Sequence, residues 1–223
     1  MYEHLYKNLI ENNADVCICD FYISTKGKNI IRNNQDEDKK YNKEKILKEI
    51  LLDKNIQSYA WNKLYKKELF NNIRYPFGKK YEDIGTTFYL LEKCNNIFVT
   101  KEPKYYYVMR DDSIVNNNSE NTIKDYIEII DSRYDYISKK YEELKPYNIY
   151  YLTKTLITAY TDMYKLKDIK EETYLRILKL KEKVKKIYIE NEEKIIKLFD
   201  EKQKIELYTI FYDEKLFKKL ISE

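Results

Sequence analysis

Apolar positions in the first third of the chain switch between helical spacing and short continuous runs. Residues 1–13 carry apolar side chains at helical spacing, and two asparagines end the pattern. Residues 14–24, ADVCICDFYIS, form a continuous apolar run rich in β-branched and aromatic residues, which is typical of a buried strand. A turn then predicts a second short strand over 29–32, and the polar residues 33–42 predict a surface loop.

The same alternation continues to about residue 110. The pattern predicts helices over 43–53, 58–69 and 84–94 and a strand over 96–110. Pro103 interrupts this strand, which fits an edge or a bend. Period-two alternation would put Tyr105 and Tyr107 on one face of the strand and Tyr106 on the other.

From residue 119 onward the pattern is helical only. Isoleucine, leucine and tyrosine recur at spacings of three and four up to Pro146, which we expect to end the first helix. Two further stripes predict helices over 149–163 and 177–187, and short helices fill 190–221. We therefore expect an α/β region over 1–118, a partial sheet with flanking helices, followed by an all-helical region over 119–223.

Composition narrows the functional classes. Charged residues make up 36% of the 223 residues, but the net charge is only +4, so the charges are mixed in sign and do not indicate a nucleic-acid partner. Only three glycines occur, and neither GxGxxG nor GxxxxGK[ST] is present, which argues against a self-sufficient Rossmann or P-loop domain. We attribute the 25 tyrosines mainly to compositional bias of an AT-rich genome.

The three cysteines, Cys17, Cys19 and Cys94, are interpreted as buried small apolar residues. A closed zinc site needs about four ligands, and His4 is the only histidine. An odd cysteine count without a signal peptide favours a reducing compartment, so we expect a cytoplasmic protein. No apolar run approaches the roughly 20 residues that span a bilayer.

The adjacent acids Glu82 and Asp83 allow two readings. Asp83 could cap the helix that follows, and on spacing alone this reading is favoured because caps are common. Alternatively, one carboxylate is a general base at a helix start, with Gly85 allowing close approach of a ligand.

Two other stretches are candidate binding residues. Trp61 stands beside Asn62 and Lys63, and an aromatic face with nearby polar donors suits a sugar ring, although a core tryptophan is the simpler reading. Arg110 follows the aromatic strand, with Ser113 three residues later. It could contact a phosphate or pair with a neighbouring aspartate.

Taken in order, the segments ENNADVCICDFY, WNKLYKKELF, IRYPFGKKYEDIGTTFYLLEKC and EPKYYYVMRDDSI resemble the second half of a bacterial family 2 glycosyltransferase of the GT-A fold. The resemblance runs from Met1 to about Val115. It implies inverting transfer of a sugar from a nucleotide-sugar donor to a hydroxyl acceptor, in the synthesis of a surface polysaccharide or glycoconjugate. The residue roles that it implies are Asp83 as base, Glu82 beside it, Trp61, Asn62, Lys63 and Tyr81 at the acceptor, and Arg110 and Ser113 near the donor diphosphate.

The chain departs from the family pattern at the donor side. The family implies Mn²⁺ or Mg²⁺ on an Asp-x-Asp, but the triplet Asp36 to Asp38 lies in a polar loop rather than after an apolar strand. We therefore expect a chain that lacks the nucleotide-binding half and is inactive without it. A separate N-terminal half or a second copy of the chain would be its partner.

Two further expectations concern the helical region. It would make at most weak peripheral contact with the inner face of a membrane, because glutamates alternate with its lysines. The competing hypothesis is a non-catalytic helical interaction module in which the acidic pair is only a helix cap.

Overall fold

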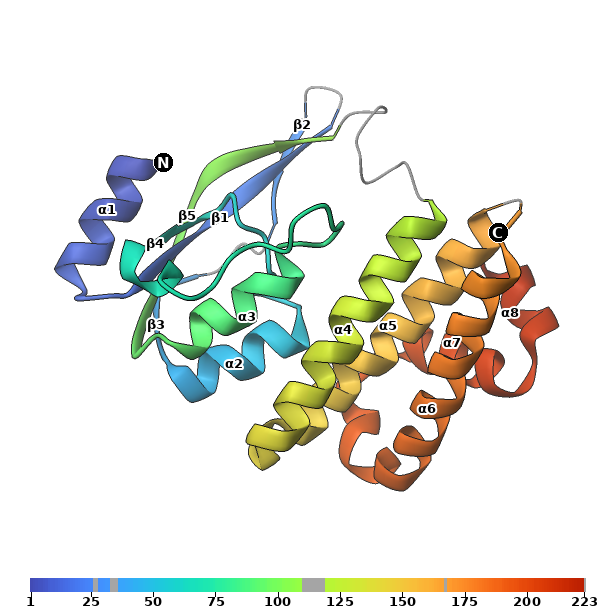
Figure 1. Ribbon diagram of the computed structural model, residues 1–223. Helices are drawn as coiled ribbons and strands as arrows, with labels where there is room; N and C mark the ends of the chain where they lie inside the picture. The colour runs from blue at the N-terminus through green and yellow to red at the C-terminus, as the bar shows by residue number, and fades with distance from the viewer. Residues whose placement is uncertain (26–27, 33–35, 110–118, 167, 223) are drawn as a thin grey trace. The chain divides into compact units, whose positions relative to one another are not determined.

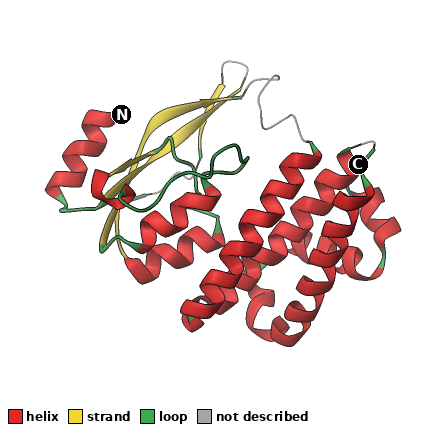
Figure 2. Ribbon diagram, in the orientation of Figure 1, coloured by secondary structure: helices red, strands yellow, loops and turns green. Residues whose placement is uncertain are grey.

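The chain divides into an α/β unit and a helical unit (Figure 2). A computed structural model describes residues 1–25, 28–32, 36–109, 119–166 and 168–222. The α/β unit comprises Met1–Gly78 and Glu82–Asn117, and the helical unit comprises Lys79–Tyr81 and Asn118–Glu223. The sequence predicts a single domain boundary between residues 118 and 119. The structure also assigns the short segment Lys79–Tyr81 to the helical unit.

The α/β unit is built on a five-stranded mixed sheet (Figure 1). Its strands are β1 (Val16–Thr25), β2 (Lys28–Ile31), β3 (Lys39–Asn42), β4 (Lys63–Tyr65) and β5 (Asn96–Val108). The strand order is β2-β1-β5-β3, and β4 pairs with the first residues of β1. The central pair β1 and β5 is parallel, and the other pairs are antiparallel.

Strand β5 bends where Pro103 lies. The register between β1 and β5 shifts on either side of Asp20, which faces Pro103. Pairing with β3 ends at Val99, so the missing N–H of proline removes no hydrogen bond on that side. Beyond the bend, Tyr105 and Tyr107 stack on one aromatic cluster and Tyr106 stacks on Tyr22, which confirms the predicted alternation of faces.

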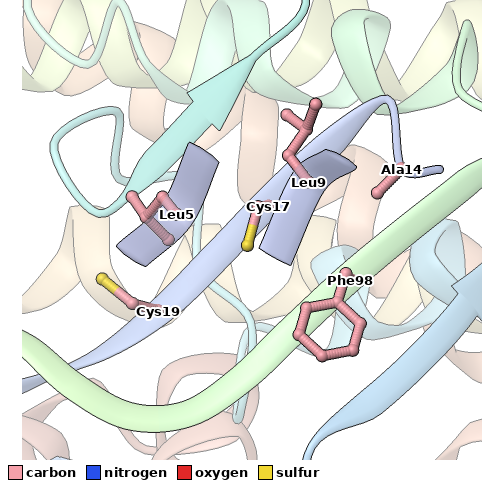
Figure 3. Packing of buried hydrophobic residues seen from close by; sticks show 6 residues of the cluster. All are labelled: Leu5, Leu9, Ala14, Cys17, Cys19 and Phe98. Carbon is pink, nitrogen blue, oxygen red and sulfur yellow. The ribbon is translucent and has the colours of Figure 1, made fainter. Parts of the chain in front are cut away.

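Three helices cover this sheet. They are α1 (Tyr2–Glu11), α2 (Lys43–Leu52) and α3 (Ile84–Glu92). Helix α1 packs Leu5 and Leu9 against Cys17, Cys19 and Phe98 (Figure 3), while α2 and α3 lie together on the opposite side (Figure 1). The cysteines are free and buried, as predicted.

Two predicted segments differ from the structure. The helix predicted over 58–69 is wrong, because Lys63–Tyr65 pairs with β1 as strand β4 and only Lys67–Phe70 forms a 3-10 helix. The polar loop predicted over 33–42 ends in β3. Both strands are only three or four residues long, so their conformation is set by backbone pairing with a distant strand and not by local pattern.

The helical unit contains five α-helices among its described residues. They are α4 (Glu120–Lys140), α5 (Lys145–Lys165), α6 (Glu171–Ile195), α7 (Glu201–Tyr212) and α8 (Glu214–Leu220), with 3-10 turns at Glu142–Leu144 and Ile196–Leu198. Helix α5 is the most buried and contacts α4, α6 and α7. Pro146 does not end α4 but stands in the first turn of α5, where its missing N–H is not needed.

None of the described helices is both long enough and apolar enough to cross a lipid bilayer.

Candidate functional site

The candidate site begins where α3 starts, at Asp83. The backbone of Asp83 is already helical, with φ −68° and ψ −42°, and its Oδ1 accepts from the N–H of Ile84, the very next residue, at 2.7 Å. An ordinary N-cap residue is extended, and its side chain accepts from an N–H two or three residues on. Four other helices here follow that second pattern, with the caps Asn42, Ser119, Asp200 and Asp213 each accepting from the third residue along. Asp83 is therefore not arranged as an ordinary cap.

The environment of Asp83 makes its carboxylate more basic. Its side chain is half-buried. Burial raises the pKa of the carboxyl above its usual value of 3.8, and the negative charge of Glu82 raises it further. The hydrogen bond from Ile84 and the positive charge of Lys63 act in the opposite direction. A carboxylate with a raised pKa is a better proton acceptor.

Lys63 is a buried cation whose charge acts on this carboxylate. The residue is only 5% exposed. Its Nζ donates to Gln57 O at 2.7 Å, to Tyr59 O at 2.6 Å and to Asn62 Oδ1 at 2.8 Å. Burial lowers the pKa of Lys63 to about 7, and the negative charge of Asp83 opposes that effect.

The charge of Asp83 acts on three tyrosine side chains that the sequence analysis did not single out. Burial raises the pKa of Tyr59, Tyr65 and Tyr75, and the charge of Asp83 raises each of them further. These tyrosines were hidden among 25 in the chain. The signal that could have found them is their position, since all three flank the Trp61 and Glu82 segments.

Trp61 belongs to an aromatic cluster drawn from three segments. The rings of Tyr59 and Tyr105 stack on the indole at centroid distances of 5.0 and 4.4 Å, and that of Tyr107 at 5.5 Å. Phe21 meets the indole edge-on at 4.7 Å. Trp61 is half-buried in this cluster, so both the core reading and the binding reading of the sequence describe part of its position.

The neighbours of Trp61 in sequence face inward. Asn62 is 5% exposed, and its Nδ2 donates to Cys19 O at 2.9 Å. The Lys63 ammonium likewise donates to the backbone oxygens of Gln57 and Tyr59. The side chains of Asn62 and Lys63 therefore stabilise the backbone on either side of Trp61.

Tyr81 and Glu82 lead into α3 with unusual backbone geometry. Tyr81 has φ +59°, which is in the left-handed region that bulky residues rarely adopt. Its ring lies 4.6 Å from that of Tyr126 within the helical unit. Glu82 is exposed, and its carbonyl accepts from Thr86 Oγ1 at 2.7 Å. Such backbone strain occurs often at functional sites.

The remaining predicted donor-side residues are not brought to this site. Arg110 and Ser113 lie outside the described residues. Asp36 and Asp38 are exposed, and Asp38 Oδ1 accepts from the N–H of Lys101 at 2.8 Å, next to β3. Among the described residues, no group of three or more His, Cys, Asp or Glu side chains could hold a metal ion. The described residues therefore do not provide a site for the divalent metal that the family resemblance implies.

Comparison with known proteins gives a relative in sequence and a distant likeness in structure. No family model matches the chain. A glycosyltransferase, GlyA, from Streptococcus pneumoniae serotype 4 is 27% identical over 122 residues. The match covers 50% of this chain and 17% of GlyA, so the chain spans about a sixth of that relative.

Among solved structures, residues 1–349 of S. aureus TarS, crystallised in complex with UDP-GlcNAc, align with a TM-score of 0.46 at 14% identity. The alignment covers 85% of this chain and 64% of the TarS chain. The sequence similarity to GlyA supports a relation to glycosyltransferases, and the α/β unit has the mixed sheet with flanking helices expected from the sequence.

Proposed function

We propose that the α/β unit is the acceptor-side part of a family 2-like glycosyltransferase with a GT-A fold. In this proposal, the enzyme transfers a sugar from a nucleotide-sugar donor to a hydroxyl group of a growing surface polysaccharide or glycoconjugate. The similarity of half the chain to GlyA supports the class of reaction.

The geometry of Asp83 is the observation that carries the proposal. A carboxylate that served only as a cap would accept from an amide two or three residues along and would gain from the positive end of the helix. Asp83 instead bonds to the adjacent amide and is half-buried, and its pKa is raised. The raised pKa makes this carboxylate a better proton acceptor than an exposed aspartate.

The proposed step is a single displacement with inversion. The acceptor hydroxyl oxygen forms a bond to the anomeric carbon while the bond from that carbon to the diphosphate oxygen breaks. The hydroxyl proton passes to a carboxylate oxygen of Asp83, and the nucleoside diphosphate leaves with the bonding electron pair. Holding the hydroxyl in line lowers the barrier, and a general base contributes about 10²- to 10⁴-fold.

The other residues of the site have supporting roles. Glu82 is exposed beside the base and would orient it or contact the acceptor. Trp61, in its cluster of tyrosines, would form the wall of the acceptor site, and Asn62 and Lys63 would hold that wall in shape. Tyr81 would contact the acceptor from the strained turn before Glu82. Arg110 and Ser113 would lie near the donor diphosphate.

Donor binding is assigned to a nucleotide-binding half that the described residues do not include. No step is assigned to a metal ion here, because Asp36 and Asp38 are exposed and Asp38 is bonded to the backbone of β5. The partner in this proposal is either a separate chain that carries the nucleotide-binding half or a second copy of this chain.

The test is release of nucleoside diphosphate from a panel of nucleotide sugars. The chain is assayed alone and combined with a nucleotide-binding half, each with Asp83 and with Asp83→Asn. We expect transfer only in the combination and its loss in the variant. Transfer at a near-normal rate in the Asn variant would leave Asp83 as a helix cap, whereas no transfer by the combination would favour the interaction-module hypothesis. Donor turnover by the chain alone would show that the donor-site assignment is wrong.

A further inference from the structure

The side chain of Lys63 forms hydrogen bonds back to the segment that precedes it in sequence. An ammonium group has three N–H donors. All three have acceptors here, namely Gln57 O, Tyr59 O and Asn62 Oδ1, at 2.6 to 2.8 Å. The protonated side chain is therefore fully satisfied, and it draws the segment 57–62, which carries Trp61, around one buried charge.

The same segment is tied to α3 and to β1. Thr87 Oγ1, in the first turn of α3, donates to Ser58 O at 2.7 Å. Asn62 Nδ2 donates to Cys19 O at 2.9 Å, and the N–H of Cys19 donates to Asn62 O at 3.0 Å. The segment thus connects the central strand to the helix that begins at Asp83.

Three titratable groups act on the Lys63 charge. They are Asp83 at the start of α3, Cys19 on β1 and Asp53 at the end of α2, and Asp83 has the largest effect of the three. The effect is mutual, because the positive charge of Lys63 lowers the pKa of Asp83 against the larger effect of burial.

We propose that Lys63 is a positioning residue, whose buried ammonium fixes the Trp61 segment against the start of α3 and balances the charge of Asp83. It does not contact the substrate in this proposal. Its importance for sugar transfer rests on the function proposed above, but its effect on Trp61 and Asp83 does not.

The proposal predicts a response to protonation of Lys63. A neutral amine has two N–H donors and one lone pair, so one of the three oxygens would lose its donor. Burial lowers the pKa of Lys63 to about 7, so the proton is lost as the pH rises through neutrality. Above that pH the segment is held less tightly and Asp83 loses its positive neighbour.

Trp61 allows this to be measured in the full chain, because it is the only tryptophan. We expect its emission to change in one transition with a midpoint near pH 7 in the wild type. Lys63→Met should abolish the transition. The matched control is Lys66→Met, three residues along, which removes a half-exposed lysine paired with Asp15 at 2.9 Å and should leave the transition in place.

Hydrogen exchange supplies a second readout. Below neutral pH, we expect amides of the segment 57–63 to exchange about tenfold faster in Lys63→Met than in Lys66→Met, because a hydrogen bond to a charged group is lost. If Lys63→Met does not fold, Thr87→Val is the alternative variant. It removes the hydrogen bond from Thr87 to Ser58 O and should give a smaller increase in the exchange rate of the same segment. Lys63→Arg, which keeps the charge, should restore part of the protection.

The results separate this inference from the proposed function. The same pH transition in Lys63→Met, or no transition in the wild type, would overturn the positioning role. If the transition belongs to Lys63 but Asp83→Asn transfers sugar normally, the positioning role stands and the catalytic proposal fails.

Discussion

Helices α3 and α7 both begin after an aspartate, and the two aspartates differ in what they do. Asp200 has an extended backbone, with φ −77° and ψ 170°, and its carboxylate accepts from the N–H of Gln203 at 2.8 Å. The Gln203 side chain bonds back to the Asp200 amide, which completes a capping box. Asp83 has helical angles, its carboxylate accepts from the N–H of the adjacent Ile84, and it is half-buried.

An acidic residue immediately before a helix is therefore not sufficient evidence of a helix cap. Asp200 is exposed and stabilises the helix that follows it. Asp83 is half-buried, which raises its pKa, so its ionised form lowers the stability of the α/β unit. Such a cost at one residue is common where a side chain is kept for function.

The largest expected effect is on sugar transfer. In the chain combined with a nucleotide-binding half, Asp83→Asn should lower the rate about 10²- to 10⁴-fold, because the amide cannot accept the hydroxyl proton. Asp200→Asn is the matched control and should keep the wild-type rate. A comparable loss of rate in both variants would mean that these substitutions act through folding.

The next effect concerns stability at neutral pH. Asp200→Ala should lower the free energy of unfolding of the helical unit by about 1 kcal/mol, because it removes a cap. Asp83→Ala should change that of the α/β unit by less than about 0.5 kcal/mol. Urea unfolding measures both free energies. Circular dichroism monitors the helical unit, and Trp61 fluorescence monitors the α/β unit. A loss of about 1 kcal/mol in Asp83→Ala would restore the cap reading.

A smaller effect depends on pH. The pKa of Asp83 is raised in the folded state, so the folded state binds more protons than the unfolded state just above pH 3.8. Wild-type stability should therefore fall relative to Asp83→Asn as the pH rises through the folded pKa, and the two should converge below about pH 3.8. Urea unfolding of both proteins at several pH values gives this difference, and an opposite slope would contradict the assigned pKa shift.

The smallest expected effect is that of Glu82→Gln. The charge of Glu82 raises the pKa of Asp83, but Glu82 is exposed and solvent screens it. Removing that charge should lower the pKa of Asp83. The acidic limb of the pH–rate profile reports this change. A larger loss of rate at all pH values would indicate that Glu82 contacts the acceptor.

Local pattern was sufficient for the elements whose stability is local. The helix over 43–53 is predicted from the spacing of its apolar residues, and the structure buries Ile46, Leu47, Ile50 and Leu51 on that face. The buried strand around Cys17 and Cys19 was predicted from its composition. The segment 58–69 was not, because its conformation depends on pairing with β1 and on the burial of Lys63.

The candidate site, too, could be predicted from the sequence only in part. The sequence identified Asp83, Glu82, Trp61, Asn62 and Lys63 as candidates, but spacing alone favoured a cap at Asp83. The backbone angles that argue against a cap cannot be obtained from the identity of the residue. The electrostatic effect of Lys63 on Asp83, twenty residues along the chain, depends on the tertiary fold, which buries the ammonium among three oxygens.

The most direct test is an NMR titration of the Asp83 side-chain carboxyl carbon in the full chain. We predict a midpoint above 3.8, and a further rise in Lys63→Met because the positive neighbour is removed. A midpoint at or below 3.8, unchanged in Lys63→Met, would identify Asp83 as an ordinary helix cap and contradict its assignment as a proton acceptor.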